Sequence, residues 1–413
     1  MTKKYTYGSI IPLIGGMTIA AKELFGYDPE WIASWGSAFG ANDKYCLEYF
    51  NSVPYIELDT GANLPPVDIV LCLPPCAGLS GANTSTSGRN PRGCNAPSNQ
   101  HMLTTSEIAM RDIKAKLVMV ENAPGLYTKM GEKFARNIRV LADQYGYAMS
   151  MVKTNTIFHG LPQSRTRTFF FLWQRGEVPI LKSIRRSYTQ LSELLIENPI
   201  LTNSPPVNKK AYRPSQMPMI EFLITNGRER KLYNTYSEMI KYYAKDKMTS
   251  VWDVIYKNDL LDEAIQWISD NKDMQNNILA QKEVKWLKYA KNKKARGLNV
   301  LNSSIKLGWE KINALTWQIM PYLAHPHRDR WLTIAEALTL MRFPTDFIKS
   351  TSITTKDSNV ICQNVPVCTA KDWLEEAVAA LDGDREWVKL SPGFILRQNN
   401  TDEIKTMIPN YSP

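Results

Sequence analysis

The first 175 residues alternate short apolar runs with stretches of helical pattern. The runs Val67–Leu73 (VDIVLCL), Leu117–Val120 (LVMV) and Thr166–Trp173 (TRTFFFLW) are bounded by turn signals, which is typical of buried strands. Met17–Phe25 has the pattern of an amphipathic helix, and Gly26 is placed to end it. This alternation predicts an α/β fold with an open, doubly wound and mostly parallel sheet. Ligands of such sheets bind beyond the carboxyl ends of the strands, so polar residues there are the first candidates for a site.

The pattern changes after residue 180. Residues 181–330 are rich in Lys, Asn, Tyr and Trp, and the alternation of strands and helices fades. Within them, Asn198–Pro218 carries five prolines and predicts an irregular connection. Helical pattern returns at Thr333–Arg342, which Phe343-Pro344 closes, and again at Lys371–Leu381.

We therefore expect three parts. Residues 1–180 form the domain that carries the candidate chemistry, and residues 181–330 form a second, smaller domain. Residues 331–413 return to the first domain, where we expect the helix at Lys371–Leu381 to lie beside the first strand.

The positive net charge favours a polyanionic partner but does not by itself establish one. The chain has a net charge of +10 and a pI of about 9.1, but many basic proteins never bind nucleic acid. Val284–Arg296 (VKWLKYAKNKKAR) is a basic helix candidate with Trp286 and Tyr289 among its lysines. It is either a phosphate-contacting face with aromatic platforms or an ordinary solvated helix whose aromatic rings face the core.

Other patterns exclude some classes of protein. No run of about 18 apolar residues occurs, and the N-terminus, MTKKYTYGSI, lacks the apolar stretch of a signal peptide. We expect a cytoplasmic protein without a membrane partner. The six cysteines, at positions 46, 72, 76, 94, 362 and 368, form no C-x-x-C pair, and only four histidines are present. A metal site is therefore not expected, and most of these thiols should be small buried side chains.

One cysteine stands apart because of its setting. Cys76 follows a predicted buried strand and two prolines, Pro74 and Pro75, so it should be held rigidly. After it comes a segment rich in Gly, Ser, Thr and Asn, from Ser80 to Gly93. This arrangement suits a nucleophile beneath a mobile lid, and a structural cysteine before a loop is the alternative.

Three more features lie at the ends of predicted strands. Glu121 directly follows the run LVMV, where a carboxylate is either in a cleft or on an exposed loop. Arg165 and Arg167 are two residues apart, so in an extended chain they project to one face; surface arginines at an edge are the alternative. Gly15-Gly16 precedes the first helix and would let a nucleotide-like ligand approach the backbone, although two glycines are a weak signal.

Taken in order, these segments resemble the motifs of the cytosine-C5 methyltransferase family. PPCAGLS is similar to its Pro-Cys motif, ENAPGL to its Glu-Asn-Val motif, and GLPQSRTR to its Gln-x-Arg-x-Arg motif. Arg330–Glu336 with Phe343-Pro344, and then Gln363–Pro366, resemble the family's two closing motifs. The resemblance covers residues 8–175 and 328–382. The segment between them matches nothing specific, which fits a recognition domain that varies with the target sequence.

The resemblance implies an activity and roles for these residues. Cys76 would attack C6 of a cytosine as a thiolate, which makes C5 able to accept a methyl group from S-adenosylmethionine. Glu121 would contact N3 and the exocyclic amine, Arg165 would orient the base from its O2 side, and Arg167 would support the site. The target base would be flipped out of double-stranded DNA bound between the two domains, and the Ser80–Gly93 loop would close behind it. The enzyme is expected to be a monomer.

The resemblance also assigns binding residues. Those expected at the cofactor are Ile14, Gly15, Gly16, Trp35, Asp59, Pro75 and Gln363. Those expected at the base or the DNA are Pro75, Ser80, Asn122, Gln163, Lys285 and Lys288.

Departures from the family pattern gather at the cofactor pocket. Ile11 and Leu13 stand where the family has Phe and the first Gly of its glycine motif. No acid follows the predicted strand Trp31–Trp35 at the expected point, and Asp43 is the nearest. Cys362 and Gln363 replace Gly-Asn in the last motif, and Ala77 replaces a Gln. Either a divergent enzyme uses ordinary S-adenosylmethionine, or the pocket accepts a modified form that transfers a larger group.

Two other classes of protein compete with this interpretation. One branch of the family acts on tRNA, but the large central segment favours duplex DNA, which needs a domain that recognises sequence. A catalytically inactive DNA-binding relative is the other. The presence together of Cys76, Glu121, Arg165 and Arg167 argues against it.

Overall fold

A computed structural model describes residues 4–61, 63–80, 93–196, 199–208, 213–271, 278–297 and 305–400. Its largest element is an eight-stranded sheet in the order β14-β6-β8-β5-β4-β1-β2-β3. The strands are β1 (Tyr7–Ile10), β2 (Trp31–Ser34), β3 (Tyr55–Glu57), β4 (Ile69–Cys72), β5 (Leu117–Asn122), β6 (Ala148–Asn155), β8 (Thr166–Trp173) and β14 (Ile395–Asn399). The run from β3 to β5 is parallel, whereas β8 is antiparallel to both β5 and β6. The predicted doubly wound, mostly parallel α/β fold is therefore confirmed.

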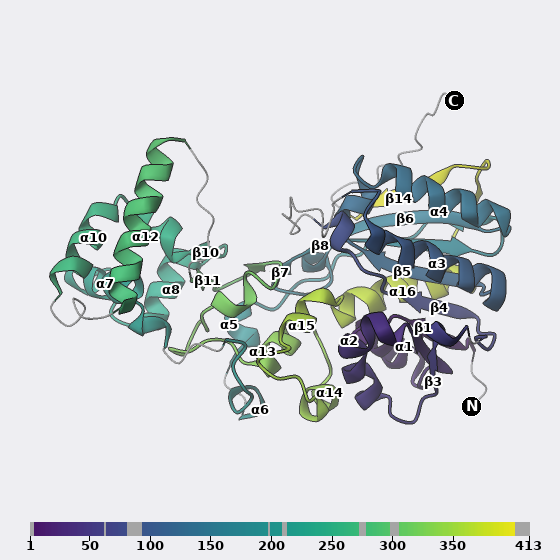
Figure 1. Cartoon of the computed structure of the whole chain (residues 1–413), viewed down its shortest axis with the longest axis horizontal. Helices are drawn as coiled ribbons and strands as arrows, with labels where there is room; N and C mark the ends of the chain where they lie inside the picture. Colours follow the sequence, from purple (N-terminus) through teal and green to yellow (C-terminus); the bar gives the residue numbers. More distant parts are fainter. Residues whose placement is uncertain are drawn as a thin grey trace.

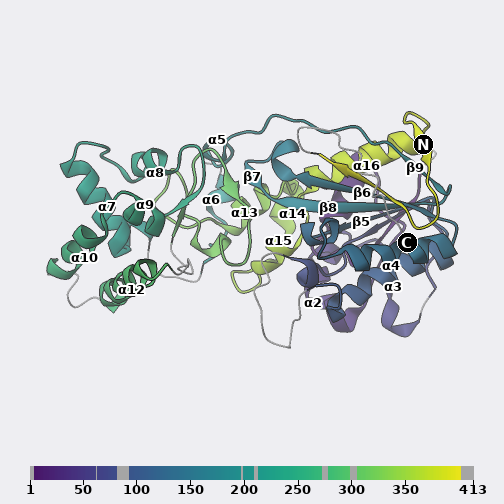
Figure 2. The same cartoon turned by 90° about the horizontal axis from the view of Figure 1, so that it is seen from above.

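Helices cover both faces of this sheet. Figure 2 shows α16 on one face and α3 and α4 on the other. The helices of this part are α1 (Gly16–Phe25), α2 (Gly36–Tyr49), α3 (Gln100–Ile108), α4 (Glu132–Gln144), α13 (Ile334–Thr339), α14 (Thr345–Ser350), α15 (Asn359–Gln363) and α16 (Val367–Leu381). We expected the last helix beside the first strand, but α16 packs on α1, the helix that follows β1.

Most predicted elements occur where the sequence placed them. Gly26 ends α1 in the left-handed conformation and donates its N–H to the Lys22 carbonyl, 2.8 Å away. β5 runs two residues beyond the predicted strand, so Glu121 and Asn122 belong to the strand and not to the turn. The helix expected from Thr333 to Arg342 is shorter, because Thr333 is its N-cap and the helix ends at Thr339.

A second hydrophobic core lies in the middle of the chain and draws on residues between 217 and 331. Its helices are α7 (Pro218–Glu229), α8 (Tyr236–Ala244), α9 (Val251–Lys257), α10 (Leu261–Asp270) and α12 (Ile278–Ala295), with a small sheet of β10 (Thr249–Ser250) and β11 (Lys306–Leu307). Leu181, Leu191 and Val207 pack into the first core instead, so the separate core begins later than residue 181. Figure 1 shows α7, α8, α10 and α12 at one end of the molecule and the large sheet at the other.

The remaining strands and α-helices link these two parts or lie at their margins. They are β7 (Gln163–Ser164), β9 (Glu177–Pro179), β12 (Ile312–Asn313), β13 (Trp387–Lys389), α5 (Leu191–Leu194) and α6 (Pro199–Thr202). The predicted irregular connection, 198–218, contains α6 and a short 3-10 turn at Pro214–Gln216, and residues 198 and 209–212 lie outside the described residues. No helix within the described ranges is long and apolar enough to cross a membrane.

Candidate active site

The topology brings the four predicted catalytic side chains to one edge of the sheet. β4 and β5 are parallel neighbours, with Cys72 paired to Val120, so their carboxyl ends lie side by side. β8 is antiparallel to β5 and begins where β5 ends, with Thr168 opposite Asn122. Cys76, which follows β4, therefore lies near Glu121 on β5 and near the two arginines at the start of β8.

Hydrogen bonds from its own backbone and from Asn122 hold the loop that carries Cys76. Cys76 is the N-cap of a short 3-10 turn, and its carbonyl accepts the Leu79 N–H at 3.1 Å. Asn122 Nδ2 lies 3.3 Å from the Pro74 carbonyl and 3.4 Å from that of Pro75, and donates to both. We expected Asn122 at the base or the DNA, but its side chain is fully buried and supports the loop that carries Cys76.

Glu121 and Arg167 form a close ion pair next to this loop. Arg167 Nε lies 2.6 Å from Glu121 Oε1, and the Glu121 side chain is only 5% exposed. The contact is an ion pair without an aligned hydrogen bond, so Glu121 Oε1 has no hydrogen-bond partner among the described residues. Glu121 is therefore a buried carboxyl beside Arg167 and not the exposed loop acid that was the alternative.

The charges at this edge act on one another. Burial raises the pKa of the Glu121 carboxyl above its ordinary value, against the lowering effect of Arg167 and Arg165. Burial also raises the pKa of the Cys76 thiol; Arg167 lowers it, Glu121 raises it further, and Arg165 lowers it. Burial thus shifts both groups toward their protonated forms relative to exposed side chains, and the two arginines oppose this shift.

The two arginines differ in their surroundings. Arg165 is 1% exposed and donates to three backbone carbonyls: from Nη1 to Leu315 at 3.0 Å, and from Nη2 to Cys362 at 2.8 Å and Asn364 at 2.7 Å. Arg167 instead faces Glu121. We expected Arg165 to orient the base and Arg167 to support the site. The Nη groups of Arg165 are bound by the protein and its buried Nε has no partner among the described residues, whereas Arg167 also donates from Nη1 to the Thr166 carbonyl at 3.1 Å.

The side-chain amide of Gln163 is also hydrogen-bonded within the protein. Its side chain is fully buried; Oε1 accepts the Leu315 N–H at 3.0 Å and Nε2 donates to the Leu340 carbonyl at 3.3 Å. A contact with DNA, as the sequence predicted, would require these bonds to open. Beside it, β7 pairs in parallel with β12, which fixes the chain as it returns from the helical part.

The loop between β1 and α1 keeps an unusual backbone. Ile11 and Leu13 both have φ of 53°, in the left-handed region that favours glycine, and Gly15 has φ of 98°. The Leu13 position therefore keeps the conformation that the family supplies with glycine, at a cost of roughly 1 kcal/mol in strain. Asp43 on α2 stabilises the loop, since its Oδ1 accepts the Leu13 N–H at 3.1 Å.

The last motif contacts this loop through Asn364, which the sequence analysis did not single out. Its Oδ1 accepts the Gly16 N–H at 3.1 Å, and a Cβ on Gly16 would lie 2.2 Å from that oxygen. Its Nδ2 is buried and has no hydrogen-bond partner within the described ranges. Gln363, the predicted cofactor residue, is exposed and only accepts from Asn42 Nδ2 at 3.4 Å. The inward-facing residue is thus one position further along the chain.

The end of β2 is aromatic. Trp35 follows this strand, and its ring meets the His101 ring edge-on with centroids 5.4 Å apart; Phe39 meets the same ring at 4.9 Å. Asp59, predicted at the cofactor, is exposed and accepts from the backbone and hydroxyl of Ser37. Asp43 is turned toward the loop instead of this edge, and burial raises its pKa to about 7 against the lowering effect of Ser34 and Leu13.

The other predicted residues are placed as follows. Ile14 is fully buried, and Pro75 and Ser80 are half-buried beside Cys76. The proposed lid falls mostly on residues 81–92, which lie outside the described residues. Lys285 and Lys288 are exposed on α12, in the helical part and not at this edge. In the part of the chain that the structure describes, no group of His, Cys, Asp or Glu is arranged to hold a metal ion.

Comparison with known proteins gives one family and many similar folds. The family model of the C-5 cytosine-specific DNA methylases matches residues 11–378. A proposed DNA modification methyltransferase encoded within an E. coli prophage has a similar structure, with a TM-score of 0.55 and 14% identity over 91% of this chain and 99% of that one. The Entamoeba histolytica methyltransferase EhMeth has a TM-score of 0.51 and 13% identity over 92% and 99%. No curated protein matches by sequence. At these identities, the structural matches show a common fold.

Proposed function

Because this chain belongs to the C-5 cytosine-specific DNA methylase family, we propose that it methylates cytosine in double-stranded DNA through a covalent bond from Cys76 to the base. The family sets the reaction, which is methyl transfer to C5 of cytosine. The duplex substrate and the covalent step are our proposal. The observation that carries it is the meeting of Cys76, Glu121 and Arg167 at one strand edge, with Glu121 Oε1 buried and without a hydrogen-bond partner among the described residues.

Each of these groups has a chemical task. The Cys76 thiolate attacks C6, forming an S–C6 bond, and the electron pair of the C5=C6 double bond moves into the ring toward N3 and O2. Glu121, whose raised pKa favours the protonated form, donates to N3 and disperses this charge. We assign to Arg167 two tasks, to hold Glu121 in place through their 2.6 Å contact and to reach O2. C5 then carries the electron density that accepts the methyl group.

The end of the reaction restores the enzyme. A base removes the proton from C5, the electron pair reforms the C5=C6 double bond, and the S–C6 bond breaks to release Cys76 as a thiolate. N3 then returns its proton to Glu121. Because C6 is hidden in a duplex, the cytosine must leave the helix before attack.

The chain's residues fit S-adenosylmethionine, which when bound supplies an electrophilic methyl group. The loop of Gly15 and Gly16 lies at the carboxyl end of β1 and opens α1, where polar ligands of such folds are held. The unused Nδ2 donor of Asn364 lies beside it, and Trp35 offers an aromatic face at the end of β2. These residues would hold the cofactor.

A modified S-adenosylmethionine is the second candidate cofactor. It is favoured by the end of β2, where Trp35 and Phe39 enclose His101 and Asp43 is turned away. A larger transferred group would be seen directly as a larger mass on cytosine.

Mass spectrometry of the modified base tests the proposal. Purified protein is incubated with duplex DNA or tRNA and S-adenosylmethionine, with Cys76→Ser as the control. We expect cytosine in the duplex to gain one methyl group, with no gain in the variant. Methylation of tRNA alone would replace the DNA substrate, and an active Cys76→Ser variant would remove the covalent step.

A further inference from the structure

One face of α12 carries positive charge that the protein does not neutralise. Lys282, Lys285 and Lys288 are spaced three residues apart and are exposed. In the described part of the chain none of these three forms an ion pair, whereas Lys291 on the same helix binds Asp262. The only acid of the helix, Glu283, is buried and accepts the Met219 N–H at 2.9 Å. The three lysines, called here the α12 lysine row, are therefore available to an anion.

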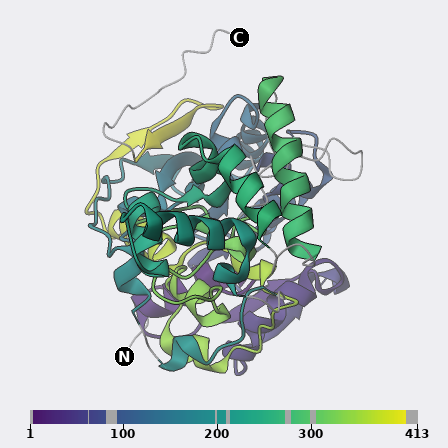
Figure 3. The same ribbon diagram turned by 90° about the vertical axis from the view of Figure 1, so that its left-hand side faces the viewer.

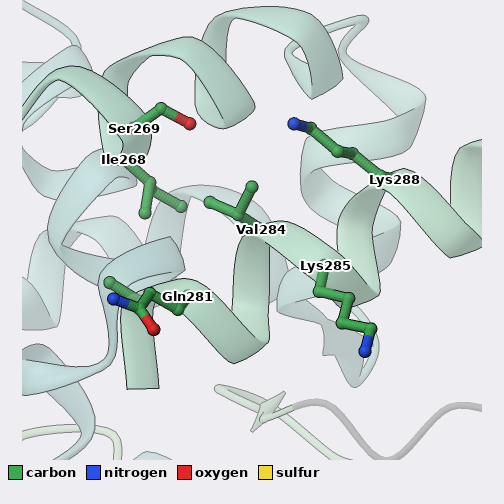
Figure 4. A pocket seen from close by; sticks show the side chains of 7 residues that line it. Ile268, Ser269, Gln281, Val284, Lys285 and Lys288 are labelled. Atoms are coloured by element: carbon green, nitrogen blue, oxygen red, sulfur yellow. The ribbon is translucent and has the colours of Figure 1, made fainter. Parts of the chain in front are cut away.

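A hollow of about 470 Å³ adjoins this row, between α10 and α12. Figure 4 shows Ile268 of α10 and Val284 of α12 pointing toward one another at its floor. Lys285 and Lys288 line it from the α12 side, and Ser269 adds a hydroxyl from α10. An apolar floor with ammonium groups at the rim matches a strand whose sugars are apolar and whose phosphates are charged.

The orientation of α12 suits a long ligand. Figure 3, which looks at the helical end of the molecule, shows α12 as a straight surface helix. In Figure 2, α12 and α2 lie toward the same edge of the molecule, and α2 begins where β2 reaches the candidate active site. A duplex that presents its cytosine at Cys76 can thus extend along this side.

We propose that the α12 lysine row and the hollow beside it bind the sugar–phosphate backbone of duplex DNA next to the target base. This inference rests on the proposed function. The row supplies affinity and not sequence preference, because an ammonium group is a point charge without the planar, bidentate geometry that distinguishes base edges. Trp286 turns inward, where its ring meets that of Trp252 with centroids 5.1 Å apart, so the proposed contact is made by the lysines and not by the Trp286 ring.

The salt dependence of binding tests this role. Fluorescence anisotropy measures the affinity of the triple variant Lys282→Gln, Lys285→Gln, Lys288→Gln for target and non-target duplexes at several salt concentrations. Each lost phosphate contact lowers the slope of log K against log salt by about 0.9, so we expect a decrease of up to roughly 2.7. Affinity should fall by the same factor for both duplexes, leaving their ratio unchanged.

A matched control removes the same charge elsewhere. Lys133, Lys182 and Lys389 are exposed on the part built around the large sheet, and their triple change to Gln should leave the slope as in the wild type. An unchanged slope in the α12 variant, a changed ratio of target to non-target affinity, or a loss confined to tRNA would overturn the inference. Methylation of the same duplex by the wild type is measured in parallel, and its absence would count against the proposed function instead.

Discussion

Arg167 Nε lies 2.6 Å from Glu121 Oε1, where β8 begins and β5 ends. This ion pair links the antiparallel strands β5 and β8 at the end of the sheet where Cys76 lies. In the proposed function this carboxyl and guanidinium act on one pyrimidine ring, whose N3 and O2 gain charge during attack.

Glu121→Gln should slow methylation without weakening DNA binding. The amide cannot deliver the proton that N3 requires, and the loss of one such group typically lowers the rate by about 10²–10³-fold. Single-turnover methylation and anisotropy on the same duplex separate the two effects. An equal loss of rate and affinity would mean that Glu121 serves binding alone.

Arg167→Gln should shift the reactivity of Cys76 to higher pH. Burial raises the pKa of this thiol and Arg167 lowers it, so removing the guanidinium leaves burial and Glu121 to raise it further. The thiolate fraction at any given pH then falls. Alkylation of Cys76 by iodoacetamide across a pH series, followed by peptide mass spectrometry, measures this thiolate fraction. The measurement needs neither DNA nor cofactor. Arg136→Gln on exposed α4 is the control, and coinciding profiles of wild type and Arg167→Gln would contradict the assignment.

Asn364→Ala should weaken binding of S-adenosylmethionine, whereas Gln363→Ala should not. Asn364 bonds the Gly16 amide and keeps a buried donor unused, while Gln363 is exposed. Loss of one such hydrogen bond corresponds to a decrease in affinity of about 3- to 10-fold. Isothermal titration calorimetry measures both variants, and a larger effect at Gln363 would restore the sequence-based assignment.

The motifs predicted which strand ends form the site but not which side chains face it. Arg165 and Arg167 were expected to project to one face of an extended chain, and both lie close enough to act on Glu121 and Cys76. Their difference in burial depends on Leu315, Cys362 and Asn364, carbonyls about 150 to 200 residues away that no local pattern reveals. The same holds for Gln163, whose partners are also distant.

A shift of one residue explains the other difference at the cofactor loop. The family pattern pointed to Gln363, but α15 ends there and the next residue turns inward to Gly16. The spacing of the motif could not show which of the two adjacent amide side chains, Gln363 or Asn364, faces this loop. Leu13 was predictable as a departure from the family pattern, and its positive φ lies in the region that favours glycine, the residue which that pattern has here.

Glu336 should make the fold sensitive to acid. Although burial raises its pKa, hydrogen bonds and charge from Arg330 and His325 lower it to about 2. Since the folded pKa lies below the ordinary value of 4.5, the carboxylate stabilises the fold above that pH, and the contribution is lost as pH falls toward 2. The difference corresponds to about 3 kcal/mol in the free energy of unfolding. Urea unfolding of wild type and Glu336→Gln measures this: the variant should be less stable at pH 7 and lose less stability between pH 4.5 and 3. Parallel curves for the two proteins would show that Glu336 is not the group that titrates.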